Sequence, residues 1–245
     1  MIDDPNVRPW LVLGAILLVN CGATAVSAWF SGHHRLRRVV TVNLILVTCF
    51  GALLGQFGPL LSNYGNAWYA AVIGAHLVIL DRFGRLAASE TMPACYLAVS
   101  VALLGTYPLT FVQVLPGNEI GQAVVALAQY RPQMLIASYA ALGPTLAVVD
   151  IVYSWLRPRS RTVAVIAAVV VGQAVDTAIF FPIAFYELGM EIMVTAALSG
   201  LILKIPMTLA VVAAGMMASQ RVTPPISRPI PQPTTPGRRH RARAS

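Results

Sequence analysis

Residues 162–185 have the sequence TVAVIAAVVVGQAVDTAIFFPIAF, and this stretch decides the fold class of the chain. It is continuously apolar over more than the roughly 20 residues that an α-helix needs to cross the hydrocarbon core of a bilayer. Its one charged residue, Asp176, lies well inside it. Because the apolar residues do not alternate with polar ones, the stretch predicts a membrane-spanning helix rather than a strand of a β-barrel.

The composition of the whole chain agrees with this stretch. The 245 residues are 57% hydrophobic and 11% charged, and the mean hydropathy is +0.71. A soluble domain usually carries about 25% charged residues. This difference excludes a water-soluble enzyme, and it also excludes disorder for the main body of the chain. We therefore predict an all-α, polytopic membrane helix bundle with six or seven transmembrane helices.

Seven apolar stretches are candidate spans, and together they predict a transmembrane helical domain over residues 1–219. The seventh gives way to a basic, proline-rich segment, 220–245, which predicts a disordered tail. Residues 118–130 are apolar but too short to cross, so they predict an interfacial or re-entrant segment. Six spans result if the first or third stretch does not cross. The candidate spans are 10–30, 39–61, 66–80, 92–112, 133–156, 162–185 and 192–219.

Charges in the gaps between spans predict the orientation. Arginines occupy the gaps 31–38, 81–91 and 157–161, whereas the intervening gaps carry mainly acidic residues or no charge. Under the positive-inside rule, seven spans then place the N-terminus outside and the C-terminus in the cytoplasm, with the chain in the cell membrane. This arrangement accounts for the net charge of +8 better than nucleic-acid binding does. Membrane lipid is therefore an expected partner, and a homo-oligomer is left open.

Sequence motifs for catalysis and metal binding are missing from the chain. It contains no GxxxxGK[ST], HExxH or GxSxG pattern, so we expect neither an ATPase of its own nor a hydrolytic enzyme. Cys21, Cys49 and Cys95 lie in separate apolar stretches and form no metal-ligand spacing. We therefore predict a protein that is not an enzyme and that has no cofactor and no metal site.

Ionisable residues inside the spans are the best candidates for a functional site, because a charge is costly at that depth. Gln173, Asp176 and Phe180 recur at helical spacing on one face, with Thr177 beside it. Lys204 is the only lysine and lies inside the last span. The simplest account pairs Asp176 with Lys204 across two adjacent helices. The pair either fixes helix register or borders a polar pocket that contacts a solute or carries a proton.

Two further residues are weaker candidates for the same site. Asp150 lies about two turns from the cytoplasmic end of its span, from which it reaches either Arg157 or cytoplasmic water. His76 lies five residues before Asp81, and a lone histidine is more often a satisfied interior residue than a ligand. Both remain candidates for binding a substrate, and His76 also for carrying a proton.

The last two spans also carry a family resemblance. The stretches GQAVDTAIFFPIAF (172–185) and MEIMVTAALSGLILKIPM (190–207) resemble the corresponding spans of the queuosine-precursor transporters, known as the VUT family. Family members have an Asp-Thr pair three residues after Gln or Asn and a lysine in the next helix. The resemblance covers about 66–210 within a family-like core of about 39–219. It departs at Gly143-Pro144, where the family usually has Ser-Gln.

The resemblance implies import of a 7-deazaguanine base such as preQ0 or preQ1, with no catalytic residue. In that role Asp176 would accept the base's N–H groups, with Gln173 as a second polar contact. Phe180 or Phe181 would stack on the ring, and Lys204 would keep Asp176 ionised or bond the ring carbonyl. Two alternatives stay open. One is a substrate-binding membrane subunit of a vitamin or nucleobase transporter energised by separate ATPase subunits, and the other is a non-transport membrane scaffold.

Overall fold

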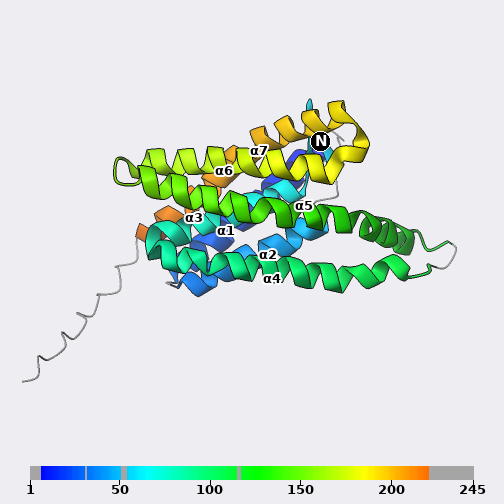
Figure 1. Cartoon of the computed structure of the whole chain (residues 1–245), viewed down its shortest axis with the longest axis horizontal. Helices are drawn as coiled ribbons and strands as arrows, with labels where there is room; N and C mark the ends of the chain where they lie inside the picture. Colours follow the sequence, from blue (N-terminus) through cyan, green and yellow to red (C-terminus); the bar gives the residue numbers. More distant parts are fainter. Residues whose placement is uncertain (1–6, 31, 51–53, 115–116, 221–245) are drawn as a thin grey trace, which may run out of the picture.

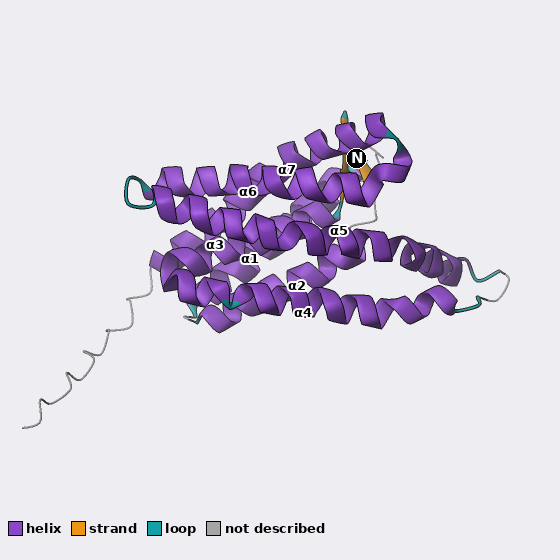
Figure 2. Ribbon diagram, viewed as in Figure 1, coloured by secondary structure: helices purple, strands orange, loops and turns teal. Residues whose placement is uncertain are grey.

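The computed structural model describes residues 7–30, 32–50, 54–114 and 117–220. Within them the backbone is almost entirely helical (Figure 2). Two short 3₁₀ segments, η1 (Tyr107–Phe111) and η2 (Tyr186–Leu188), follow the fourth and sixth helices. The seven α-helices are α1 (Arg8–Trp29), α2 (His33–Phe50), α3 (Gly65–Ser89), α4 (Thr91–Thr106), α5 (Glu119–Leu156), α6 (Arg161–Phe185) and α7 (Met190–Gln220).

The predicted fold class, an all-α membrane helix bundle, is confirmed. Consecutive helices run in opposite directions along a common axis (Figure 1). Four segments are long and apolar enough to cross a membrane: α1, α5 from Pro132, α6 with η2, and α7. Helices α2, α3 and α4 pack beside them, so the described part of the chain places seven helices side by side. The predicted tail, 220–245, lies outside the described residues except for Gln220.

Helix α3 forms the centre of the bundle, where it packs against α2, α7 and α1. Its residues from Gly65 to Leu80 are buried almost without interruption, which small side chains make possible. A Cβ added to Gly74 would lie 2.7 Å from a methyl group of Val211, so a larger residue cannot be accommodated at this crossing with α7. The helix extends beyond the predicted span 66–80 and is broken at Gly84, where φ is +82°.

The predicted span 39–61 is wrong in its second half. Helix α2 ends at Phe50, and a β-hairpin follows, with strand β1 (Leu54–Phe57) antiparallel to β2 (Leu60–Asn63). Gly58 adopts φ +62° in the connecting turn, a conformation that glycine reaches without steric cost. The Phe57 ring is buried and contacts the ring of Tyr64 at 5.3 Å between centroids. The hairpin therefore covers the end of the bundle where α3 begins.

Residues 118–130, predicted as an interfacial or re-entrant segment, do not form an element of their own. These residues belong to α5, which continues through Pro132 and Pro144 to Leu156. At 1.5 Å per residue the helix is about 57 Å long, nearly twice the thickness of the hydrocarbon core. Figure 1 shows its first turns and the end of α4 projecting together beyond the other helices. This projection lets α5 start outside the apolar layer and still cross it.

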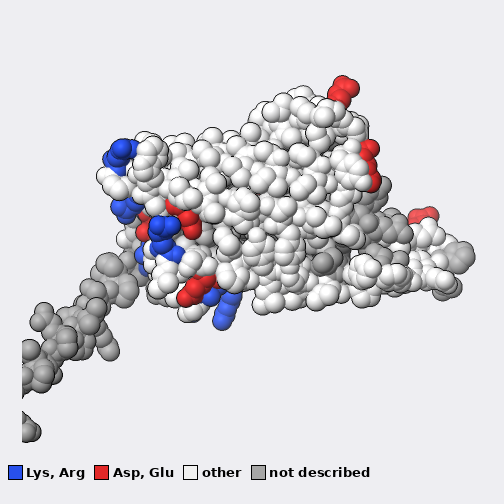
Figure 3. Space-filling view, viewed as in Figure 1, with Lys and Arg blue, Asp and Glu red and all other residues white. Residues whose placement is uncertain are grey.

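Most of the described arginines lie at one end of the bundle, with the acidic residues Asp81 and Glu90 paired among them. Arginines gather at the end where α2 and α6 begin and where α3 and α5 finish, as Figure 3 shows. We call this the arginine end; its members are Arg35, Arg37, Arg38, Arg82, Arg85, Arg157, Arg159 and Arg161. The opposite end carries Glu119, Glu187 and Glu191, together with Arg8 at the start of α1. This pattern matches the alternation of charge that predicts the orientation.

Candidate functional site

A buried ion pair between α6 and α7 forms the core of the site. Lys204 Nζ lies 2.6 Å from Asp176 Oδ2, and the two side chains are 1% and 4% exposed. The ammonium also donates to Thr177 Oγ1 at 3.3 Å. It lies over the rings of Phe181 and Tyr69, at 5.4 and 5.6 Å from their centroids. Hydrogen bonds and ring contacts thus offset part of the cost of removing the lysine charge from water.

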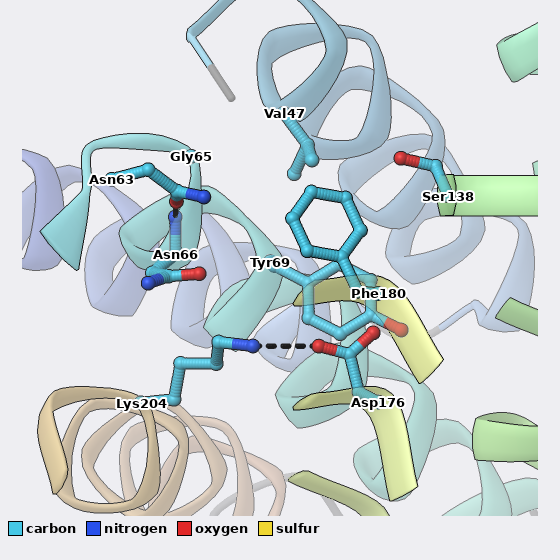
Figure 4. Close-up of a pocket in the computed structure, with 9 residues that line it drawn as sticks. All are labelled: Val47, Asn63, Gly65, Asn66, Tyr69, Ser138, Asp176, Phe180 and Lys204. Atoms are coloured by element: carbon cyan, nitrogen blue, oxygen red, sulfur yellow. Dashed lines mark hydrogen bonds and ion pairs between the residues drawn. The ribbon is translucent and has the colours of Figure 1, made fainter. Parts of the chain in front are cut away.

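A cavity of about 20 Å³, room for about one water molecule, lies beside this ion pair. Both charged side chains border it, so the pair is not sealed in an apolar seam (Figure 4). Five helices and strand β2 contribute to the wall. The lining residues are Val47, Asn63, Gly65, Asn66, Tyr69, Ser138, Asp176, Phe180 and Lys204.

The start of α3 supplies a polar wall that the sequence analysis missed. The Asn66 amide group donates to Ser62 Oγ at 2.7 Å, and its backbone N–H donates to Asn63 Oδ1 at 2.8 Å. These bonds connect the hairpin to the first turn of α3 and hold both asparagines at the cavity. Two asparagines and a serine just before an apolar helix are a local signal of a helix start. Nothing in the sequence, however, indicates that they lie near Asp176.

Gln173 and Thr177, both predicted site residues, lie behind the cavity wall. Gln173 is fully buried and donates to Thr208 Oγ1 at 2.7 Å, and that hydroxyl donates to the carbonyl of Lys204 at 2.8 Å. Thr177 contacts the ammonium of Lys204 and does not line the cavity. Both residues therefore support the ion pair from behind, so a direct contact between Gln173 and a ligand is absent from this arrangement.

The two candidate aromatic residues occupy different environments. Phe180 borders the cavity, whereas Phe181 is fully buried against Lys204. Their rings meet edge to face, with centroids 5.6 Å apart. Of these two candidate stacking residues, only Phe180 lines the cavity.

His76 and Asp150 lie outside the cavity wall and contact each other. His76 Nε2 is 2.7 Å from Asp150 Oδ1, and the two side chains are 1% and 18% exposed. The expectation that Asp150 reaches Arg157 is wrong, because Arg157 is instead 3.6 Å from Asp81 and bonds the Tyr153 hydroxyl.

Asp81 forms an ion cluster at the arginine end. Its carboxylate accepts two hydrogen bonds from Arg161 and one from Tyr153. In the part of the chain that the structure describes, no three His, Cys, Asp or Glu side chains gather in a way that holds a metal ion. The cavity at Asp176 is therefore the strongest candidate for binding a small molecule.

Comparison with known proteins agrees with this interpretation. The model of the family described as "Putative vitamin uptake transporter" matches residues 63–217, which include both ion pairs and every cavity-lining residue except Val47. No curated protein and no solved structure matches the chain. The family model covers well over half of the sequence and all of α3 to α6. The chain therefore belongs to the vitamin uptake transporter family and is a multi-pass membrane transporter.

Proposed function

We propose that the chain imports a queuosine precursor, a 7-deazaguanine base such as preQ0 or preQ1, through the cavity at Asp176. The observation that carries this proposal is a buried carboxylate, already balanced by Lys204, that borders a small cavity. A guanine-like edge presents a ring N–H and an exocyclic NH2 side by side. A carboxylate can accept both hydrogen bonds, and such charge-assisted bonds are the stronger kind.

The rest of the cavity wall suits the other parts of such a base. The Phe180 ring offers a flat surface for stacking, and Lys204 offers a donor for the ring carbonyl. Asn66 and Ser138 add polar groups at the edge. The cavity has a volume of about 20 Å³, which is room for about one water molecule, so it must widen to admit a bicyclic base.

The position of the cavity along the bundle supports the proposed direction of import. Its wall includes the last turns of α2, the end of β2 and the first turns of α3, all of which lie away from the arginine end. Because arginines mark the cytoplasmic side, the proposed orientation places the cavity nearer the outside of the cell membrane and the C-terminus in the cytoplasm.

Uptake of labelled preQ0 tests the proposed substrate. Cells that lack their own route for the base and express this chain should accumulate it faster than cells with an empty vector. Unlabelled preQ1 should compete, whereas adenine should not, because adenine lacks the carbonyl and the paired donors of a guanine-like edge. Uptake equal to that of the empty vector, or equal competition by adenine, would show that this base is not the substrate.

Replacing the two phenylalanines separately tests the stacking surface. Phe180→Leu should raise the KM for uptake about tenfold, because base–aromatic stacking contributes roughly 1–3 kcal/mol. Phe181→Leu makes the same change one residue away, behind the wall. It should leave KM close to the wild-type value and lower the free energy of unfolding by about 1 kcal/mol, because it leaves a void beside Lys204. Equal effects of the two variants on KM would contradict a specific role for Phe180.

A further inference from the structure

The His76–Asp150 pair is a second buried acid–base pair that base binding does not use. His76 lies seven residues after Tyr69 on α3, which places it about 10 Å along the helix from the cavity wall. It precedes Asp81, in the ion cluster at the arginine end, by five residues. The pair therefore lies between the cavity and the end of the bundle that faces the cytoplasm in the proposed orientation.

Unpartnered polar atoms surround the region between the two ion pairs. Among the described residues, His76 Nδ1 and Gln173 Oε1 make no hydrogen bond, although both atoms are buried. The buried Tyr69 hydroxyl lies near Asp176 and Thr145. An unmade hydrogen bond costs roughly 1–3 kcal/mol in a protein interior. Internal water molecules usually satisfy buried atoms of this kind.

Tyr69 links the Asp176 cavity to α5. Tyr69 is within interaction range of both Asp176 and Thr145. The Thr145 methyl group lies 3.9 Å from the position that a Cβ on Gly172 would take, and Gly172 directly precedes Gln173. The polar groups therefore extend from the Asp176 cavity towards α5, the helix that carries Asp150.

The hydrogen bond to Asp150 defines where a proton can bind. If His76 Nε2 carries its hydrogen and donates it to Asp150, then Nδ1 is the free acceptor nitrogen of a neutral imidazole. A proton that adds to Nδ1 converts the pair from a net charge of −1 to zero. A buried pair with a net charge is costly, so the protonated pair is the form that a closed, water-excluding conformation favours.

Other titratable groups on the helices around His76 already have roles. Asp176 and Lys204 pair with each other, and Asp81 is held by the ion cluster at the arginine end. Of the groups facing this region, only Asp150 contacts the imidazole in the described part of the chain. Ionisable groups on the neighbouring elements include Cys21 on α1, Cys95 on α4, Tyr153 on α5, Asp176 on α6 and Lys204 on α7.

We propose that the His76–Asp150 pair is a proton-binding site and that each imported base is accompanied by one proton bound there. This inference rests on the proposed function and adds its energy source. The proton adds to His76 Nδ1, the ring nitrogen that faces away from Asp150, while Asp150 keeps the hydrogen bond from Nε2 and balances the added charge. Release towards the arginine end returns the pair to its net negative state and completes the cycle.

Reconstituted liposomes test this coupling with labelled preQ0 as the probe. If one proton accompanies each base, an acidic exterior should drive accumulation by about tenfold per pH unit of gradient. His76→Gln keeps a donor for Asp150 but cannot bind the proton, so it should lose this accumulation. It should still exchange external labelled preQ0 for internal unlabelled preQ0, because exchange needs no net movement of protons. The exposed His34→Gln is the matched control and should respond to the gradient like the wild type.

The outcomes separate this inference from the proposed function. If the wild-type protein exchanges preQ0 but does not respond to the pH gradient, the proton site is wrong and the proposed substrate still stands. The same conclusion follows if His76→Gln accumulates preQ0 like the wild type. Wild-type protein that neither exchanges nor takes up preQ0 contradicts the proposed substrate. In that case, histidine NMR of the full chain tests whether His76 binds a proton. The ring resonances of His76 should change on acidification and respond to Asp150→Asn, and a His76 whose resonances ignore both changes overturns the proposal.

Discussion

Asp176→Asn is expected to lower uptake of the 7-deazaguanine base by about a hundredfold or more. Hydrogen bonds to a charged group contribute roughly 1.5–3 kcal/mol each, and the variant weakens or loses two of them. Each 1.4 kcal/mol corresponds to about a tenfold change in affinity, which gives the expected factor. The amide also turns its NH2 group towards one of the donors of the base, so one oriented contact becomes repulsive. The measurement is the initial rate of labelled preQ0 uptake at a fixed amount of protein in the membrane.

Stability must be separated from binding in this experiment, because Asp176→Asn leaves Lys204 without its counter-ion. Thermal unfolding with and without preQ0 makes that separation. Saturating preQ0 should raise the unfolding temperature of the wild type but not that of the variant. Glu187→Gln makes the same chemical change on an exposed side chain beyond the end of α6, and it should behave like the wild type. A folded Asp176→Asn protein with normal uptake would remove Asp176 from the binding site.

The sequence predicts the centre of the site well because charges inside apolar helices must find partners. Asp176 and Lys204 are the acid and the base inside the last two spans, and they form the expected ion pair. The opposite wall could not be predicted in the same way. Tyr69 and Asn66 approach the pair only because α3 runs through the middle of the bundle. Local periodicity predicts a helix over these residues, but it does not predict which other helices that helix packs against.

The fold shows the same division between local signals and tertiary packing. Helices of uniform apolar composition, such as α6 and α7, have nearly the predicted ends. The β-hairpin was missed because its residues are as apolar as a membrane helix, although the Gly58-Pro59 dipeptide is a turn signal inside the predicted span. The continuity of α5 was missed for the opposite reason. Pro132 ordinarily interrupts a helix, but here it lies within one that continues past it.

The other large effect is expected from Lys204→Met, which should lower the free energy of unfolding by about 3–5 kcal/mol. The substitution keeps the approximate length of the side chain and its packing against Phe181 and Tyr69, but it leaves the buried Asp176 carboxylate without a counter-ion. The double variant Asp176→Leu, Lys204→Met removes both charges and should recover most of the lost stability, because an apolar pair of similar volume often replaces a buried ion pair without cost. Equilibrium unfolding in detergent micelles measures both changes.

Uptake then distinguishes a structural ion pair from a binding site. The double variant should recover most of the wild-type stability and still take up no preQ0, because the carboxylate proposed to receive the base is gone. Arg38→Met removes a positive charge from an exposed position at the arginine end and should change neither property. Normal uptake by the double variant would mean that the pair only fixes the register of α6 against α7. Wild-type stability of Lys204→Met would mean that Asp176 takes up a proton when its partner is removed, which relieves the cost of an unpaired charge.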